Sequence, residues 1–160
     1  THPSHIRAFL RENVHWLEQK LREMERQGVR LAPPLPGVPD TFTWRGDLTL
    51  VCWESARFPR VRTEAGRTTI GLDLEHHDAD LIARRVMRAH IAAQMKREVA
   101  RLTRLYDPIV GRQVVATRLA PMKSLWGSLS VGGRMALDLS LMLAPPAALE
   151  YVVVHEMCHL

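Results

Sequence analysis

The chain has 160 residues, of which 46% are hydrophobic and 24% charged, and 22 Lys and Arg against 17 Asp and Glu give a formal net charge of +5. This composition excludes disordered, collagen-like and low-complexity chains and predicts a single globular domain. No apolar run reaches the roughly 18 residues that cross a bilayer, and no signal peptide opens the chain. Its two cysteines are too few for a disulfide framework. We therefore expect a soluble, cytoplasmic protein without a membrane segment.

The first 74 residues divide into a helix, a connector and strands. Apolar residues at helical spacing, followed by the stop signal Gly28, predict an N-terminal helix within residues 1–30. Four prolines in residues 31–40 exclude a helix and favour an extended connector. Residues 41–74 alternate polar with β-branched or aromatic residues around turn signals such as Gly46-Asp47. This pattern predicts two hairpins, or three to four antiparallel strands.

A long basic helix is predicted over residues 78–106, closed by Asp107-Pro108. Its apolar stripe moves to the nearly opposite side, from Ile82, Val86, Ala89 and Ala93 to Ile91, Met95, Val99, Leu102 and Tyr106. We therefore expect the helix to bend or to change packing partners near its middle. Nine basic and two acidic residues lie between Leu81 and Arg118. Such a helix can attract nucleic acid, but a solvated face is the preferred interpretation, because no aromatic residues interleave.

Residues 113–160 are predicted to hold three strands and a final helix. The strands are expected over residues 113–118, 123–130 and 135–143, with a glycine-containing turn between the last two. Pro145-Pro146 marks a helix start, because proline is tolerated in the first turn. Helices and strands come in blocks along the chain, which predicts an α+β fold with a mostly antiparallel sheet packed with helices.

The final helix carries the pattern His-Glu-x-x-His at His155, Glu156 and His159. Two histidines four residues apart share one face of a helix, so both imidazoles can reach one tetrahedral Zn²⁺ at about 2.0–2.1 Å. Glu156 lies between them, where its carboxylate can take a proton from an activated water. The alternative is a pair of surface histidines beside a carboxylate, with no metal.

Three motifs near the end of the chain occur in a distinctive order. A loop Trp126-Gly127-Ser128 is followed by a strand-like run from Leu137 to the prolines, and then by Tyr151 and an apolar run into His-Glu-x-x-His. In this order and spacing, residues 121–160 resemble the YgjP-like zinc metallopeptidase-like domain family, which is related to SprT-like and WLM domains among the zincin-type metalloproteases. The likeness extends more loosely over the rest of the chain. It implies a zincin-like fold with the His-Glu-x-x-His pattern on the C-terminal helix.

The resemblance also implies a zinc-dependent hydrolase, most simply a metallopeptidase that acts on peptides or proteins. His155 and His159 would bind Zn²⁺, and Glu156 would be the catalytic general base. Trp126-Gly127-Ser128 would contact substrate, and the run 123–130 is the candidate edge strand that holds an extended peptide. In similar proteins a third zinc-binding His lies downstream, which here falls past Leu160. We accordingly expect residues 1–160 to be a domain cut at both ends from a longer protein.

Some positions near the expected cleft differ from the family's usual residues. Leu125 and Leu129 stand where the family usually has Arg and Cys. Asp138, Leu139 and Ser140 stand where it usually has Asn, Trp and Arg. Polar and aromatic residues around the cleft have thus largely become aliphatic or small, whereas the residues expected to touch metal are retained.

Two other functions stay open at this point. The first is a metal-dependent hydrolase of a nucleotide phosphoanhydride, for which the basic helix could hold the anionic group. The second is a non-catalytic zincin-like domain that binds a protein partner or nucleic acid. The oligomeric state cannot be read from the sequence.

Other polar residues receive no functional role. The third-ligand candidates inside the chain are Asp73, Glu75, His76, His77 and Asp138, but none has a spacing that supports it. His76-His77 is interpreted as an exposed turn. Cys158 is expected to be a small buried residue rather than a metal ligand. His90 is assigned to neither core nor function.

Overall fold

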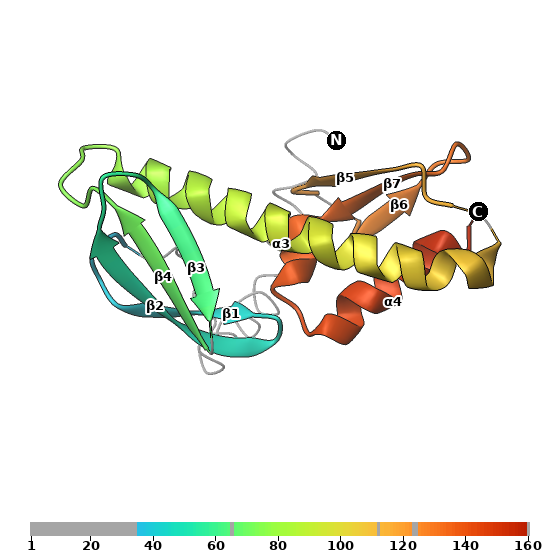
Figure 1. The fold of residues 1–160 in the computed structure, drawn as a ribbon, viewed down its shortest axis with the longest axis horizontal. Helices are drawn as coiled ribbons and strands as arrows, with labels where there is room; N and C mark the ends of the chain where they lie inside the picture. Colours follow the sequence, from blue (N-terminus) through green and yellow to red (C-terminus); the bar gives the residue numbers. More distant parts are fainter. Residues whose placement is uncertain (1–34, 65, 112, 123–124, 160) are drawn as a thin grey trace, which may run out of the picture. The chain divides into compact units, whose positions relative to one another are not determined.

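A computed structural model describes residues 35–64, 66–111, 113–122 and 125–159 of the chain (Figure 1). All of them belong to one compact unit, Pro34–Leu160. They form an α+β fold, as the order of predicted elements indicated, but contain two small sheets where a single mostly antiparallel sheet was expected, with two helices. The predicted N-terminal helix in residues 1–30 and the first part of the connector lie outside the described residues.

The first sheet is built from two hairpins. Its strands are β1 (Asp40–Trp44), β2 (Asp47–Ser55), β3 (Arg60–Glu64) and β4 (Arg67–Leu72), in the order β1-β2-β4-β3. The hairpins β1-β2 and β3-β4 are antiparallel, but β2 and β4 pair in parallel, so the expectation of antiparallel strands throughout was wrong for this pair. The charged side chains of β3 favour an edge position, because the buried residues of β4 need neighbours on both sides.

The turn between β1 and β2 joins this sheet to the C-terminal helix region. Arg45 and Gly46 both have positive φ, 52° and 88°, which is typical of a two-residue hairpin turn. The turn therefore falls one residue before the predicted Gly46-Asp47. The Gly46 N–H donates to the carbonyl of Leu143 at 2.9 Å, and a Cβ on Gly46 would come within 2.9 Å of Pro145.

The long helix α3 (Ala79–Val110) begins where predicted and ends later than predicted. Pro108 lies inside its last turn, where the missing N–H removes only one helical hydrogen bond. The helix then stops at Gly111, whose φ of 75° is left-handed and whose N–H donates to the carbonyl of Asp107 at 2.9 Å.

The change of packing partners along α3 is confirmed. Ala79 and Ala83 near its start pack with Val51, Ile70 and Leu72 of the first sheet. The second half packs into another core through Met95, Val99 and Leu102. Ala89 and Ala93, which the predicted stripe included, are exposed instead.

The second sheet contains β5 (Ala116–Ala120), β6 (Gly127–Leu129) and β7 (Arg134–Asp138), in the order β5-β7-β6. β6 is antiparallel and β5 parallel to β7. The predicted third strand, 135–143, ends at Asp138, where the short 3-10 helix η1 (Leu139–Met142) begins because the Asp138 carboxylate accepts the Ser140 N–H.

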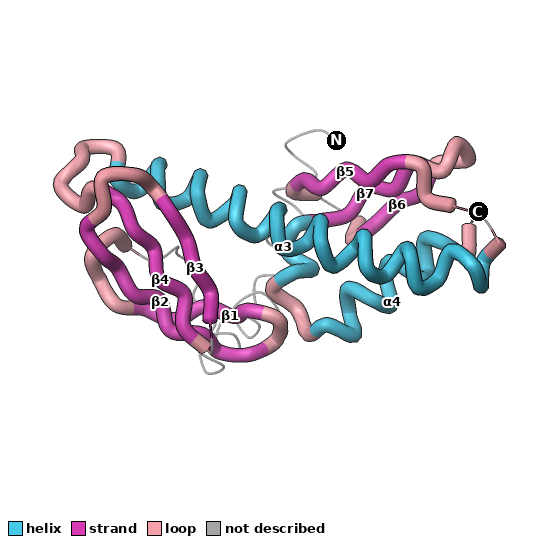
Figure 2. The backbone as a smooth tube through the Cα atoms, in the orientation of Figure 1, coloured by secondary structure: helices cyan, strands magenta, loops and turns pink. Residues whose placement is uncertain are grey.

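The helix α4 (Pro146–Met157) follows η1 (Figure 2). Pro146 lies in its first turn, as predicted. Among the described helices, none combines the length and apolar character needed to cross a membrane.

Candidate active site

The helix α4 presents one face to the core and another to solvent. Leu149, Val153 and Met157, four residues apart, are buried in the core formed with α3 and β7. The Tyr106 hydroxyl of α3 lies 2.5 Å from the Glu150 carboxylate and ties the two helices together. This packing leaves His155 exposed on the other side of the helix.

The two predicted zinc ligands lie side by side at the end of α4. The helix ends at Met157, so His155 lies on it and His159 in the turn that follows, where its N–H donates to the Glu156 carbonyl at 3.0 Å. The Nε2 atoms of His155 and His159 are 3.4 Å apart, and both residues are exposed. Two nitrogens on one tetrahedral Zn²⁺ at about 2.0–2.1 Å would be about 3.3–3.4 Å apart. The separation is thus compatible with one shared zinc ion, and it is also a hydrogen-bond distance between the two imidazoles.

Glu156 lies between α4 and strand β6, with only 9% of the residue exposed. A Cβ built on Gly127 would come 3.0 Å from the Glu156 Cγ and 3.1 Å from its Oε1. Within the part of the chain that the structure describes, no hydrogen bond or ion pair engages this carboxylate. It is thus a confined acceptor against β6.

The predicted substrate loop lies at the edge of the second sheet. β6 pairs with β7 only, so its other edge has no strand partner among the described strands. Trp126 is 61% exposed, and its carbonyl accepts the Asp138 N–H at 2.9 Å. The structure therefore brings Gly127 of this loop against Glu156, while Lys123 and Ser124 of the predicted edge strand fall outside the described residues.

Tyr151, which the sequence motif included without assigning it a role, lies beside His155. Its ring stacks on that of His155, with centroids 5.9 Å apart and planes at 23°, and Tyr151 is 69% exposed. The signal that could have found it is the spacing of four residues, which places both rings on one helix face.

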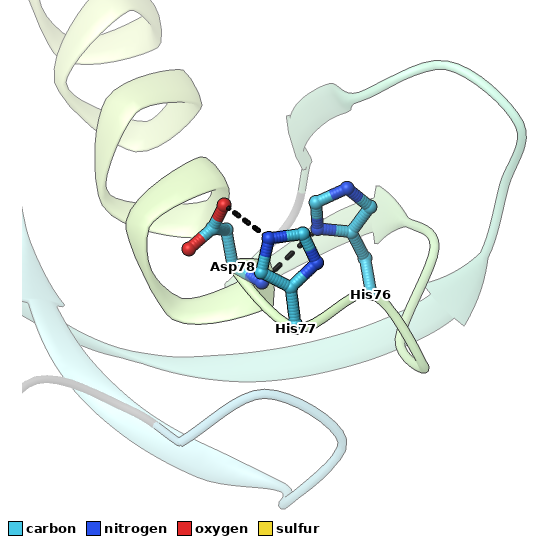
Figure 3. A group of neighbouring side chains, drawn as sticks. All are labelled: His76, His77 and Asp78. Carbon is cyan, nitrogen blue, oxygen red and sulfur yellow. Dashed lines mark hydrogen bonds and ion pairs between the residues drawn. The ribbon is translucent and has the colours of Figure 1, made fainter.

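A separate group of metal-ligand types lies at the start of α3 (Figure 3). His76, His77 and Asp78 bring their ligand atoms within 4.8 Å of one another. These atoms are already engaged, because the His76 Nδ1 accepts the Asp78 N–H at 3.0 Å and the His77 Nε2 lies 2.9 Å from the Asp78 carboxylate. The predicted exposed turn agrees with this arrangement. No described group of three such residues includes His155 or His159.

The other third-ligand candidates also have local roles. The Asp73 carboxylate accepts the Glu75 N–H at 3.1 Å in the same turn before α3. Asp138 is 7% exposed, and its carboxylate accepts the N–H of Met122 and both the N–H and the hydroxyl of Ser140. Three donors thus occupy most of the roughly four acceptor sites of this carboxylate, which gives Asp138 a local structural role.

Cys158 departs from its expected environment. It was predicted to be buried, but it is exposed. The reason is that α4 ends at Met157, so Cys158 belongs to the turn and not to the buried helix face.

The basic residues of α3 form a solvated face. Arg84 and Arg101 pair with Asp80 and Glu98 on the same helix, each at 2.9 Å. The remaining exposed cations of the helix are Arg85, Arg88, Lys96, Arg97 and Arg104. Such pairs on an exposed helix favour solvation over a dedicated nucleic-acid site.

Comparison with known proteins gives one match. The sequence model of a family described as YgjP-like, metallopeptidase domain, matches residues 1–160. No curated protein and no solved structure matches the chain. The match covers the whole sequence, including the part upstream of residue 121 where the motif resemblance was loose.

Proposed function

Because the chain belongs to the YgjP-like metallopeptidase domain family, we propose that it hydrolyses peptide bonds with a zinc ion bound by His155 and His159. The observation that carries this proposal is the 3.4 Å separation of their Nε2 atoms. That separation is compatible with a shared tetrahedral ion, and both imidazoles are accessible from solvent. A catalytic zinc site needs one further protein ligand, which the family resemblance implies downstream of Leu160.

Glu156 has the surroundings of a general base. When bound, zinc would activate a water molecule and polarise the scissile carbonyl. Glu156 directly follows His155 in the chain, and its carboxylate has no competing partner among the described residues. It can accept a proton from the attacking water and deliver it to the leaving amine.

The substrate would lie along strand β6. An extended peptide can add to a free strand edge through main-chain hydrogen bonds, and β6 offers such an edge beside α4. Gly127 lets β6 itself approach Glu156 closely, and Trp126 and Ser128 flank this glycine. Peptides and proteins are therefore the substrate class that the site suits.

The decisive experiment measures zinc content and hydrolysis with the full-length protein. Glu156→Gln keeps the shape of the side chain and removes its basicity, so we expect zinc stoichiometry to stay unchanged while casein hydrolysis falls by about 10²-fold or more. His155→Ala should lose zinc. Glu64→Gln, at an exposed position of β3, is the matched control and should keep wild-type activity.

Each other outcome contradicts the proposal in a distinct way. Full activity of the Gln variant would remove Glu156 from the mechanism. Hydrolysis of nucleoside triphosphates with casein intact would favour phosphoanhydride chemistry. A full-length protein that binds zinc but hydrolyses neither substrate would be a binding domain. A full-length protein that binds no zinc would contradict both zinc-dependent reactions.

A further inference from the structure

Asp138 joins three segments that surround the candidate site. It is the last residue of β7 and precedes η1, the short helix that leads into α4. One carboxylate oxygen, Oδ1, accepts the Ser140 N–H at 2.8 Å and also the Ser140 hydroxyl. The other, Oδ2, accepts the Met122 N–H at 2.5 Å. The carboxylate therefore ties the start of η1 to the segment after β5.

The main chain of Asp138 makes a second connection to the same region. Its N–H donates to the carbonyl of Trp126 at 2.9 Å. One residue thus holds Met122 through its side chain and Trp126 through its backbone. Trp126 directly precedes β6, so the Asp138 main chain holds the residue before that strand, while the carboxylate fixes residue 138 between Ser140 and Met122.

The start of β6 in turn determines the approach to Glu156. Gly127 follows Trp126 directly, and its α-carbon lies against α4 so closely that a Cβ would come 2.9 Å from the Val152 Cγ1 and 3.0 Å from the Glu156 Cγ. A displacement of Trp126 must therefore move Gly127 toward or away from Glu156. Because close-packed protein interiors transmit small shifts, the displacement would change the position of Gly127 relative to Glu156.

The chemistry at residue 138 requires a carboxylate. Three donors converge on two oxygens, and an amide in the same place would direct N–H groups at one of the donors. Burial alone would raise the pKa of Asp138, but the hydrogen bonds from Ser140 and Met122 outweigh it and hold the pKa below its usual value. The group is thus a permanent acceptor near neutral pH.

We propose that Asp138 is a positioning residue of the candidate active site, which sets Gly127 and the free edge of β6 against Glu156. The predicted effect of Asp138 on catalysis rests on the proposed peptidase function. Its predicted effect on the position of β6 does not depend on that function. It also couples two departures from the family's usual residues, since the Ser140 hydroxyl binds the carboxylate that Asp138 supplies.

The test compares four variants of the full-length protein. Asp138→Asn removes the acceptor and should lower kcat by about 10- to 100-fold through misplacement of the site, with a smaller change in KM and unchanged zinc stoichiometry. Ser140→Ala removes one donor and should have a smaller effect, which Ser140→Thr should reverse by restoring the hydroxyl. Asp80→Asn, which alters an exposed carboxylate paired with Arg84, is the matched control.

A readout independent of activity accompanies the kinetics. The backbone amide resonances of Met122, Ser140 and residues 127–129 should shift in Asp138→Asn and stay in place in Asp80→Asn. Unchanged resonances at residues 127–129, or unchanged kcat in a folded Asn variant, would overturn the inference. If the Asn variant fails to fold, equal kcat for Ser140→Ala and Ser140→Thr would overturn it instead. An inactive wild-type protein with bound zinc would refute the peptidase proposal, and the amide shifts would still decide the role of Asp138.

Discussion

Gly127 and Glu156 lie in direct contact across the boundary between β6 and α4, with no room for a side chain on the glycine. A Cβ at residue 127 would come 3.0 Å from the Glu156 Cγ and 3.1 Å from its Oε1. Gly127 does not have a positive φ, so the glycine is required by this close approach and not by backbone conformation. The contact gives the Trp-Gly-Ser loop a physical role beside the proposed general base.

Gly127→Ala should therefore reduce peptide hydrolysis and leave the fold intact. The added methyl must displace Glu156 or Val152, and a shift of this size at a reacting group costs about 10-fold or more in kcat/KM. The measurement is steady-state kinetics on a peptide with zinc content determined in parallel. Gly132→Ala is the matched control, because its Cβ would meet only the Ser130 Oγ at 4.0 Å. Equal activity of the two variants would show that the contact between Gly127 and Glu156 does not affect catalysis.

The local part of the site could be predicted from the sequence, and the long-range part could not. His155, Glu156 and His159 form a pattern with helical spacing, so their proximity follows from local geometry alone. The contact of Gly127 with Glu156 depends on how β6 packs on α4. The spacing of residues along the sequence does not predict such a contact. The hydrogen bond to the Asp138 carboxylate from the Met122 N–H likewise comes from another segment of the chain.

Leu102 is a central core residue of α3, and its replacement should destabilise the protein strongly. It is 1% exposed, whereas Leu105 on the same helix is 50% exposed. Leu102→Ala should lower the free energy of unfolding by about 2–5 kcal/mol through lost burial and an internal cavity. Leu105→Ala should change it by about 0.5 kcal/mol or less. Urea unfolding of both variants checks the difference, and similar losses would contradict the assigned face of α3.

The hydrogen bond between Tyr106 and Glu150 should stabilise the contact between α3 and α4. Tyr106→Phe removes the hydroxyl that lies 2.5 Å from the Glu150 carboxylate, so we expect a lower melting temperature. Tyr151→Phe is the control for stability, because Tyr151 is largely exposed. Equal melting temperatures for the two variants would show that the hydrogen bond adds nothing.

The same hydrogen bond raises the pKa of the Tyr106 phenol, with burial adding to the effect. The folded pKa therefore lies above the unfolded value of about 10. The stabilisation is fully present below about pH 10 and is lost as the pH rises through the folded pKa. Thermal unfolding at alkaline pH should show a smaller difference between Tyr106→Phe and wild type than unfolding near neutral pH.

The fold shows a similar division between local and long-range signals. Helix α3 and both hairpins follow from periodicity and turn residues, and the shift of the apolar stripe correctly indicated two packing partners. The parallel pairing of β2 with β4 was missed, because alternation along a strand does not say which neighbour it pairs with. The sequence also failed to predict that the expected strand 135–143 ends at Asp138 and continues as η1. That change depends on the Asp138 carboxylate, which accepts the Ser140 N–H.

His90 should make the stability of the protein sensitive to mild acid. Its ring is partly buried, lies 5.6 Å from that of Trp44 between centroids, and has its Nε2 3.1 Å from the Thr63 hydroxyl. Burial and the charge of Arg97 lower the pKa of His90 below its usual value. A lowered pKa means that folding favours the neutral ring, so the stabilisation is complete above the unfolded pKa of about 6.5 and is lost as the pH falls through the folded pKa.

The measurement is urea unfolding of wild type and His90→Phe at about pH 7.5 and about pH 5.5, values that bracket the ordinary histidine pKa. We expect wild type to lose more stability than the variant over this interval, because phenylalanine cannot take up a proton. His77→Phe removes an exposed imidazole and should behave like wild type. An NMR titration of the His90 ring that gives the usual pKa would contradict the predicted acid sensitivity, and a pKa above the usual value would reverse its sign, since a protonated ring would then stabilise the folded state.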